Sequence, residues 1–433
     1  METWAREFFW VCVAVVAVGV PLYAARVRGS TYAGFAAVIL LFSLPGALWS
    51  EARLAGLAGG GSARWVSVGF ALGTLAAGWH LAHLVRARLR GPVFRWLVSV
   101  PGQAFVAAGF VAIGWALLLS PFRLGLWAAG ADAWLTALRW LDLVPFVLAL
   151  GSIRTSLLPR VEHVQVQLAP APHDRAEAFV RAPVVRQRGW PAPAASGAEP
   201  GLRIVQITDP HLGPWQPVAR LQRSLESLLE SDPDLVLLTG DFLTMEGQGT
   251  PGALGEALAP LRAVQDRCYA IFGNHDHEAP DEVRGALEQC GADLLIDDAR
   301  RVDTRCGPVQ IIGADYVGRG RGEHLAGLLA RFPREPDALR LLLLHDPLGF
   351  REIAPGEVDL TLSGHTHGGQ VGLVSFGLDW TVLGRTRWPD HGFFAQGSNR
   401  LYVHRGTGFY GFPLRIGVPG EHSVLELLPH ATR

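Results

Sequence analysis

The first part of the chain is dominated by long apolar segments that contain no acidic or basic side chain. A helix needs roughly 20 predominantly apolar residues to cross about 30 Å of hydrocarbon, and a water-soluble core rarely uses such uninterrupted runs. Tryptophans lie near several of the segment ends, where a membrane interface favours them. The pattern predicts four membrane-spanning helices, at residues 8–25, 32–49, 65–85 and 97–122.

A fifth apolar stretch, at 131–151, is interrupted by Asp132, Arg139 and Asp142. Arg139 and Asp142 are three residues apart, so on a helix they could face each other and lower the cost of placing both charges in lipid. The alternative is an amphipathic helix lying on the membrane surface. This stretch decides on which side of the membrane the rest of the chain lies.

The distribution of arginine predicts an orientation, because cytoplasmic loops carry an excess of basic residues. The loop between the third and fourth segments is rich in arginine, and placing it inside puts the N-terminus outside. Five spans then bring the second half of the chain into the cytoplasm, whereas four leave it outside. We expect an integral protein of a bacterial inner membrane with its second half on the cytoplasmic face. The arginines are Arg86, Arg88, Arg90 and Arg95.

Composition changes after the apolar half. Residues 161–168 alternate like a half-exposed strand, and 169–200 are rich in Ala and Pro, as in a linker or an inserted loop. We therefore expect a multi-pass transmembrane domain at 1–155, a strand plus linker at 156–200 and a soluble domain at 201–433. The formal net charge of -1 gives no electrostatic reason to expect nucleic acid as a partner. The oligomeric state stays open.

Short apolar runs in the soluble domain end at residues that commonly bind metals. Leucines at helical spacing in 218–229 separate the first two runs, which predicts a strand, helix, strand order and hence an α/β sheet. Side chains that bind ligands collect at the carboxyl ends of the strands in such sheets. The expected strands are 202–207, 235–238, 269–272, 341–344 and 360–362. The candidate metal ligands at their ends are Asp209, His211, Asp241, Asn274, His345, His365 and His367.

Carboxylate, amide oxygen and imidazole together favour divalent ions of the Mn, Fe or Zn type over a thiolate site. Seven ligands are too many for one catalytic ion, whereas two ions that share a carboxylate would use them well. Such a pair can bind phosphate oxygens and activate a water for in-line attack on phosphorus. His275, next to Asn274, would be free to stabilise the transition state or protonate the leaving oxygen.

The blocks D-x-H, G-D, G-N-H-D, H and G-H-x-H, in this order, resemble the calcineurin-like metallophosphoesterase superfamily from about residue 202 onward. SGHTHGGQ and the tail LYVHRGTGFYGFPLRIGVPGEHSVLEL look like its branch of membrane-associated bacterial phosphodiesterases, which includes transmembrane proteins with a metallophosphoesterase domain. The resemblance implies an α/β domain of two mixed β-sheets sandwiched by helices, after the α-helical membrane domain. It also implies one metal on Asp209, His211 and His367, a second on Asn274, His345 and His365, a bridging Asp241, and His275 as acid or charge stabiliser.

The expected function is that of a membrane-anchored phosphodiesterase or pyrophosphatase that uses two divalent metal ions and a bridging hydroxide. Tethering raises the effective concentration toward membrane-resident substrates, so a lipid-linked phosphoester or diphosphate is one candidate substrate. The alternative is a non-catalytic membrane sensor or transporter with a metal-binding regulatory domain. The intact ligand set and His275 argue against a degenerate site. The role of His404 stays open between contacting the substrate and capping a strand.

Overall fold

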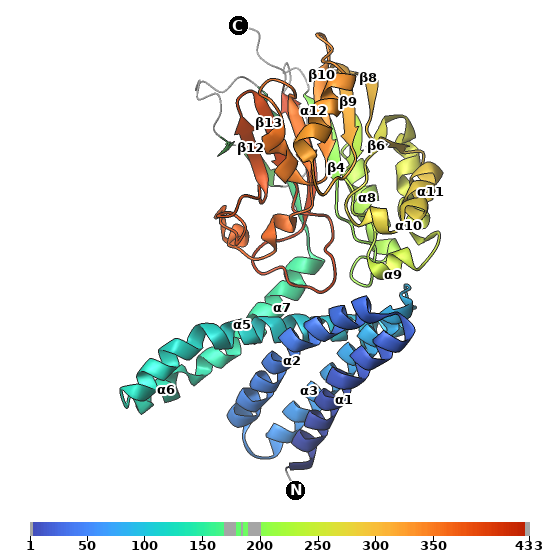
Figure 1. Cartoon of the computed structure of the whole chain (residues 1–433). Helices are drawn as coiled ribbons and strands as arrows, with labels where there is room; N and C mark the ends of the chain where they lie inside the picture. Colours follow the sequence, from blue (N-terminus) through green and yellow to red (C-terminus); the bar gives the residue numbers. More distant parts are fainter. Residues whose placement is uncertain (1–2, 169–178, 183–184, 189–200, 429–433) are drawn as a thin grey trace. The chain divides into compact units, whose positions relative to one another are not determined.

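The computed structural model describes residues 3–168, 179–182, 185–188 and 201–428 and divides into two compact units (Figure 1). The first unit comprises Met1–Arg154 and Gly411–Ile416, and the second comprises Thr155–Tyr410 and Gly417–Arg433. Most of the Ala/Pro-rich stretch that we interpreted as a linker or inserted loop lies outside the described residues.

The first unit is α-helical, and many of its large apolar side chains are exposed. Val11, Leu41 and Leu118 are all more than half exposed, which suits a lipid solvent better than water. Five helical segments of the described chain are long and apolar enough to cross a membrane, and the fifth stretch qualifies by length and composition. The helices are α1 (Thr3–Val27), α2 (Ser30–Ala58), α3 (Ala63–His83), α5 (Val100–Ala128), α6 (Asp132–Ala137) and α7 (Val144–Leu157).

Small residues allow two of these helices to pack closely. A Cβ atom on Gly46 of α2 would lie 2.0 Å from the carbonyl oxygen of Gly109 in α5, so only glycine fits at this crossing. Close backbone approach of this kind drives association where apolar side chains gain nothing by leaving lipid.

The charged residues of the fifth stretch have partners other than the predicted ones. Asp142 is buried and lies 2.6 Å from Arg53 of α2 and 2.7 Å from Arg123 of α5. Arg139 is exposed, and its guanidinium lies over the ring of Trp140. The predicted pairing of Arg139 with Asp142 is therefore wrong, because the carboxylate pairs with arginines of two other helices and the guanidinium lies over Trp140.

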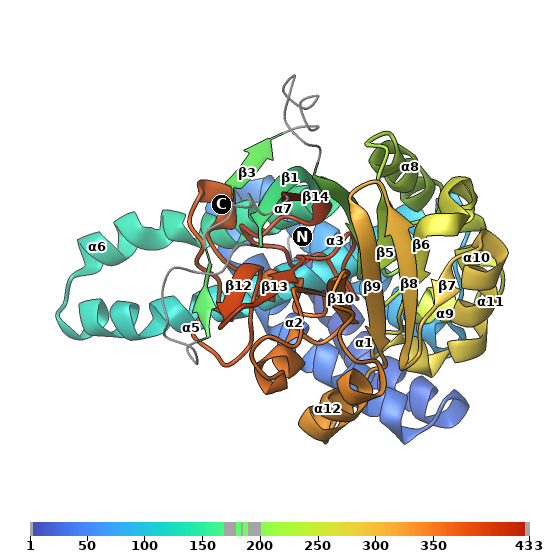
Figure 2. The same ribbon diagram turned by 90° about the horizontal axis from the view of Figure 1, so that it is seen from above.

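The second unit contains two mixed sheets of seven strands each. Figure 2 shows these sheets from above. The first sheet has the order β3 (Val185–Arg188), β1 (Arg160–Gln167), β14 (Glu421–Leu428), β4 (Leu202–Ile207), β5 (Leu235–Leu238), β6 (Cys268–Ala270), β7 (Asp293–Leu294). The second has the order β2 (Val180–Arg181), β12 (Gly392–Gln396), β13 (Asn399–Val403), β11 (Leu360–Ser363), β10 (Leu339–Leu344), β9 (Gly307–Ala314), β8 (Asp298–Thr304). β4, β5, β6 and β7 run parallel in the first sheet, and β9, β10, β11 and β13 run parallel in the second.

The main core lies between the two sheets, and helices cover their outer faces. In β10, Leu341 and Leu343 face the other sheet, while Leu342 and Leu344 pack with α12 (Arg321–Arg331). A continuous run of leucines is what a strand buried on both faces requires. The expected class, a helical membrane domain plus an α/β domain of two mixed sheets, is confirmed. Further helices of this unit are α8 (Val218–Leu229), α10 (Ala253–Ala257) and α11 (Pro280–Cys290).

The parallel strands bring the predicted ligands to the carboxyl ends of two sheets, because β4, β5 and β6 belong to the first sheet and β10 and β11 belong to the second. β4 and β5 begin and end at the predicted residues, and β10 and β11 extend each predicted strand by one or two residues. Each candidate ligand follows the carboxyl end of its strand by no more than a few residues. Adjacent parallel strands end at the same edge of a sheet, so side chains distant in sequence meet there.

Candidate metal centre

The backbone at the candidate ligands is held in an uncommon conformation. Among the described residues, eight non-glycine residues have positive φ, and five of them are predicted ligands. Such left-handed positions cost roughly 1–3 kcal/mol each and persist where the surrounding structure and a function require them. The five ligands are Asp209, His211, Asp241, His365 and His367, with φ between 45° and 69°.

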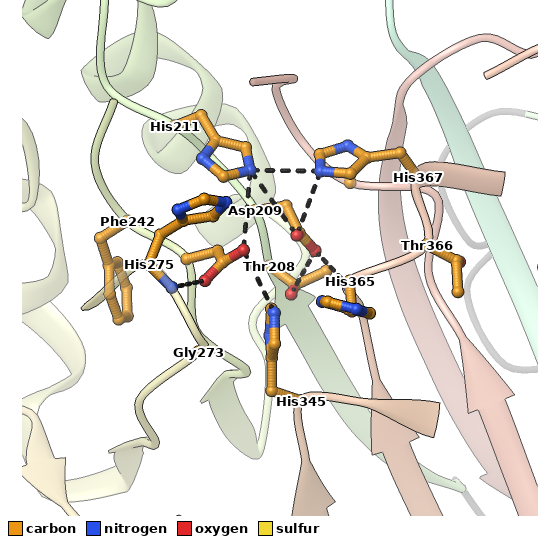
Figure 3. A network of polar contacts seen from close by, with 12 residues as sticks. Thr208, Asp209, His211, Phe242, Gly273, His275, His345, His365, Thr366 and His367 are labelled. Atoms are coloured by element: carbon orange, nitrogen blue, oxygen red, sulfur yellow. Dashed lines mark hydrogen bonds and ion pairs between the residues drawn. The ribbon is translucent and has the colours of Figure 1, made fainter. Parts of the chain in front are cut away.

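Asp209, His211 and His367 form the first group, in which one ligand atom from each lies within 4.8 Å of the others. The Nε2 atoms of His211 and His367 are 3.1 Å apart, and His367 Nε2 is 3.3 Å from Asp209 Oδ1. Figure 3 shows the two imidazoles facing each other beside Asp209. Ligands about 2.1 Å from one ion are separated by about these distances.

Asp241, His345 and His365 form the second group. His345 Nδ1 donates a hydrogen bond to the Thr239 carbonyl oxygen at 2.6 Å, which leaves Nε2 free to bind a metal. Asn274, the remaining predicted ligand, has a buried Oδ1 atom with no hydrogen-bond partner among the described residues. A buried amide oxygen without a donor is costly, so a cation at this point would satisfy it.

Asp241 lies between the two groups. Its Oδ2 atom is 3.2 Å from His345 Nε2 and 3.9 Å from His211 Nε2, and the residue is 2% exposed. Its other oxygen accepts a hydrogen bond from the backbone N–H of His275 at 2.8 Å. One carboxylate oxygen thus lies near a ligand atom of each group, whereas the second oxygen holds the carboxylate in place through its hydrogen bond.

The electrostatics of the cluster favour added positive charge. Burial opposes ionisation of Asp209, but the neighbouring imidazoles, His367 foremost, hold the pKa of its carboxyl well below its ordinary value. Burial likewise disfavours charge on His345, but Asp241 outweighs it and raises the pKa of His345 to about 10. Burial lowers the pKa of His211 to about 3, so this imidazole is neutral, as a metal ligand must be. The donor set therefore fits divalent cations.

His275 lies beside the ligands without joining either group. Its Nδ1 is 2.8 Å from Glu278 Oε1, and its ring stacks on Tyr410 with centroids 4.3 Å apart. Figure 3 shows the ring next to His211, and the two ring centroids are 5.8 Å apart. The imidazole is therefore oriented by one carboxylate and one aromatic face, with its position relative to the ligands set by the backbone hydrogen bond to Asp241.

Three residues of the site were not predicted from the sequence. Asp276 is buried and accepts hydrogen bonds from the backbone N–H groups of Asp241, Phe242 and Gly273, which ties the second and third ligand loops together. Burial and then the Asp241 carboxylate raise the pKa of Asp276 to about 7. Trp388 stacks on His365, and Tyr410 stacks on His275. In the sequence, the only signal for these three residues was Asp276 itself, the Asp of G-N-H-D that follows Asn274 and His275.

The structure favours the capping role for His404 and places three aromatic residues of the C-terminal region in the interior. His404 is fully buried, and its Nδ1 accepts a hydrogen bond from Gly406 N at 2.9 Å, so it caps the end of β13. Phe393, Phe394 and Phe409 are at most 5% exposed and belong to the packed interior.

Sequence comparison shows which known proteins this chain resembles. The family model for calcineurin-like phosphoesterases matches residues 202–369. Phosphodiesterase YaeI of Escherichia coli (strain K12) is 28% identical over 232 residues, covering 52% of this chain and 82% of that protein. The uncharacterized metallophosphoesterase YkoQ of Bacillus subtilis (strain 168) is 32% identical over 229 residues, covering 50% of this chain and 80% of that protein. A transmembrane protein with metallophosphoesterase domain from Danio rerio is 29% identical over 254 residues, covering 52% and 53%.

The chain belongs to the calcineurin-like phosphoesterase family. It is accordingly a hydrolase of the metallophosphoesterase class, in which divalent metal ions act on a phosphoester substrate. The fold and this class were both expected from the ordered motifs, and both are confirmed. Its five helices that are long and apolar enough to cross a membrane, together with relatives named as transmembrane proteins, suggest a membrane protein.

Proposed function

We propose that this protein is a membrane-anchored phosphodiesterase or pyrophosphatase that works with two divalent metal ions of the Mn, Fe or Zn type. The observation that carries the proposal is the position of Asp241, whose Oδ2 lies 3.2 Å from His345 and 3.9 Å from His211. One ion would be held by Asp209, His211 and His367, and the other by Asn274, His345 and His365. Asp241 would bind both ions. When bound, such a pair supplies charge for phosphate oxygens and a water of lowered pKa.

The protein's own side chains would orient the reaction. The strained left-handed residues hold their carboxylates and imidazoles rigidly, so little reorganisation is needed when a phosphate arrives. Asp276 keeps the Asp241 and Gly273 loops at a fixed separation through three backbone N–H donors. Thr239 holds His345 in the tautomer that presents Nε2.

His275 would stabilise the transition state or donate a proton to the leaving oxygen. Glu278 accepts a hydrogen bond from Nδ1–H, which leaves Nε2 as the proton-carrying atom toward the substrate when the ring is protonated. Tyr410 stacks on the ring and restricts its rotation. Positioned proton transfer of this kind typically contributes 10²–10⁴-fold to a rate.

A lipid-linked phosphoester or diphosphate is the substrate class favoured by the apolar helices, because a membrane anchor raises the local concentration of membrane-resident substrates. We also propose that the second unit faces the cytoplasm, as the arginine-rich loop around Arg88 and five spans would require. A reporter fused after Arg433 tests this orientation, and an external reporter would contradict it.

The test of the activity uses the full chain purified in detergent. Hydrolysis of bis(p-nitrophenyl) phosphate is measured with and without Mn²⁺ for the wild type, Asp241→Asn and His275→Ala. We expect metal-dependent activity that Asp241→Asn abolishes and His275→Ala lowers by about 10²–10⁴-fold. Wild-type protein that stays inactive with every divalent ion would refute the enzyme proposal, and full activity of Asp241→Asn would refute the bridging role.

A further inference from the structure

Exposed apolar side chains of the second unit are concentrated in one segment. We name residues 371–388, which lie between the last ligand block and β12, the rim loop. Seven large hydrophobic residues of this unit are exposed among the described residues, and five of them fall within 373–382. These five are Leu373 (38% exposed), Phe376 (76%), Leu378 (54%), Trp380 (45%) and Val382 (46%). Exposed patches of this kind mark surfaces that contact a partner or a membrane.

Hydrogen bonds within the second unit fix the conformation of the rim loop. Leu373 N donates to the Trp380 carbonyl oxygen at 2.8 Å, and Val382 N donates to the Val371 carbonyl oxygen at 2.9 Å, which closes a hairpin-like turn. Thr381 is fully buried and donates from Oγ1 to Asp390 Oδ2 at 2.6 Å. The backbone is thus fixed from inside while the apolar side chains at the tip remain outside.

The rim loop is bonded to the residue that follows the last apolar helix. Arg160 Nη2 donates to the carbonyl oxygen of Ser375 at 3.2 Å, and both residues belong to the second unit. Arg160 comes three residues after Leu157, the end of α7 and of the fifth candidate span. Three residues reach at most about 11 Å, so the tip is tethered close to the point where the chain leaves that helix. Leu158, between them, is itself 56% exposed.

The rim loop carries two basic side chains, Arg385 and Arg387, against one exposed acidic side chain, Asp379, and this basic excess suits a surface of anionic lipids. Arg385 and Arg387 are exposed, and among the described residues neither forms an ion pair. Basic residues beside an apolar, tryptophan-containing surface are attracted to the phosphates of anionic lipids while the apolar side chains enter the headgroup region.

The rim loop also borders the candidate metal centre. The ring of Trp388 stacks on His365 with centroids 5.4 Å apart, and a Cβ atom on Gly369 would lie 2.9 Å from Leu383. The block that carries two predicted ligands therefore packs directly against this loop.

We propose that the rim loop docks onto the lipid bilayer that holds the protein's own helices. Phe376, Leu378 and Trp380 enter the interfacial region, and Arg385 and Arg387 contact lipid phosphates. Resting on the proposed function, this contact presents lipid-borne phosphoesters to the metal centre in preference to soluble ones.

The docking is tested on the full chain in liposomes containing phosphatidylglycerol. Phe376→Cys in a Cys306→Ser background carries an environment-sensitive fluorophore, and nitroxide-labelled lipid serves as quencher. The wild-type chain labelled at Cys306 is the matched control, because this exposed residue lies in the turn before β9, at the strand end opposite the ligands. We expect several-fold stronger quenching at position 376 than at 306. Equal quenching at both positions would overturn the proposal. Unchanged quenching in Arg385→Gln/Arg387→Gln would overturn the assignment of these arginines to lipid phosphates.

The substrate preference has a separate readout. Phe376→Ser/Leu378→Ser is assayed against bis(p-nitrophenyl) phosphate and against a diacylglycerol p-nitrophenyl phosphodiester embedded in liposomes. We expect several-fold loss on the embedded diester alone. Equal retention on both would overturn the preference. Absence of activity in the wild type would instead refute the proposed function, and the quenching result would stand independently.

Discussion

Replacement of Gly364 by alanine tests how tightly the ligand loops are packed. A Cβ atom at this position would lie 2.1 Å from Thr208 Oγ1 and 2.2 Å from Asp209 Oδ2, well inside van der Waals contact. Asp209 is fully buried, and its Oδ2 already accepts hydrogen bonds from Thr208 Oγ1 at 2.7 Å and from His365 N at 3.0 Å. The carboxylate therefore cannot make room without breaking these contacts.

The expected cost has two parts. Overpacking of a well-packed interior destabilises by about 1–3 kcal/mol. Displacement of Asp209 also moves Oδ1 from His367 Nε2, which is 3.3 Å away, and perturbation of a metal ligand's support typically costs 10–100-fold in metal affinity or activity. We expect Gly364→Ala to raise the Mn²⁺ concentration for half-maximal hydrolysis by about this factor.

The assay is a Mn²⁺ titration of phosphodiester hydrolysis, together with the melting temperature in EDTA. Gly327→Ala is the matched control, because an added Cβ in α12 meets nothing within 4 Å and alanine favours a helix. If Gly364→Ala has the wild-type Mn²⁺ requirement and melting temperature, the ligand loops are packed too loosely for this reasoning to hold.

Other changes have equally direct outcomes. Asp276→Ala leaves the backbone N–H groups of Asp241, Phe242 and Gly273 without their acceptor, so it should lower the free energy of unfolding by about 3 kcal/mol or more. Asp281→Ala, at an exposed position, should change the free energy of unfolding little. Equal effects of the two substitutions would contradict the role of Asp276. Burial, and then the His404 imidazole, lower the pKa of His422 from 6.5 to about 3, so folded His422 resists a proton that the unfolded chain accepts. The contribution of neutral His422 to the free energy of unfolding is present above pH 6.5 and is lost as the pH falls toward 3, by about 2 kcal/mol at pH 5. His422→Asn should therefore flatten the fall in melting temperature between pH 7 and pH 5. An unchanged slope would contradict this assignment.

The elements that could be predicted from the sequence were those set by local pattern. The strands at 202–207 and 235–238 are continuous apolar runs stopped by polar residues, and α8 covers the predicted helix. The convergence of the ligands within each sheet followed because adjacent parallel strands end at the same edge, whereas the pairing of two sheets was implied only by the family resemblance. The placement of β14 between β1 and β4 depends on pairing across more than 200 residues, which local pattern does not encode.

The other features that the sequence did not predict depend on tertiary packing. The partners of Asp142 come from α2 and α5, so helix periodicity within its own segment could not find them. The role of Asp276 requires three backbone groups from two loops to meet. The sequence of the rim loop is an ordinary mixture of apolar and polar residues. Only the structure shows that Thr381 is buried and Phe376 is exposed.

The central claim is that two metal ions share Asp241 in the active protein. The direct measurement is the number of divalent ions per chain, determined by elemental analysis of purified protein alongside its phosphodiesterase activity. We predict two ions per chain at full activity, with fewer ions and no activity in Asp241→Asn. Full activity with one ion or none per chain would contradict the account.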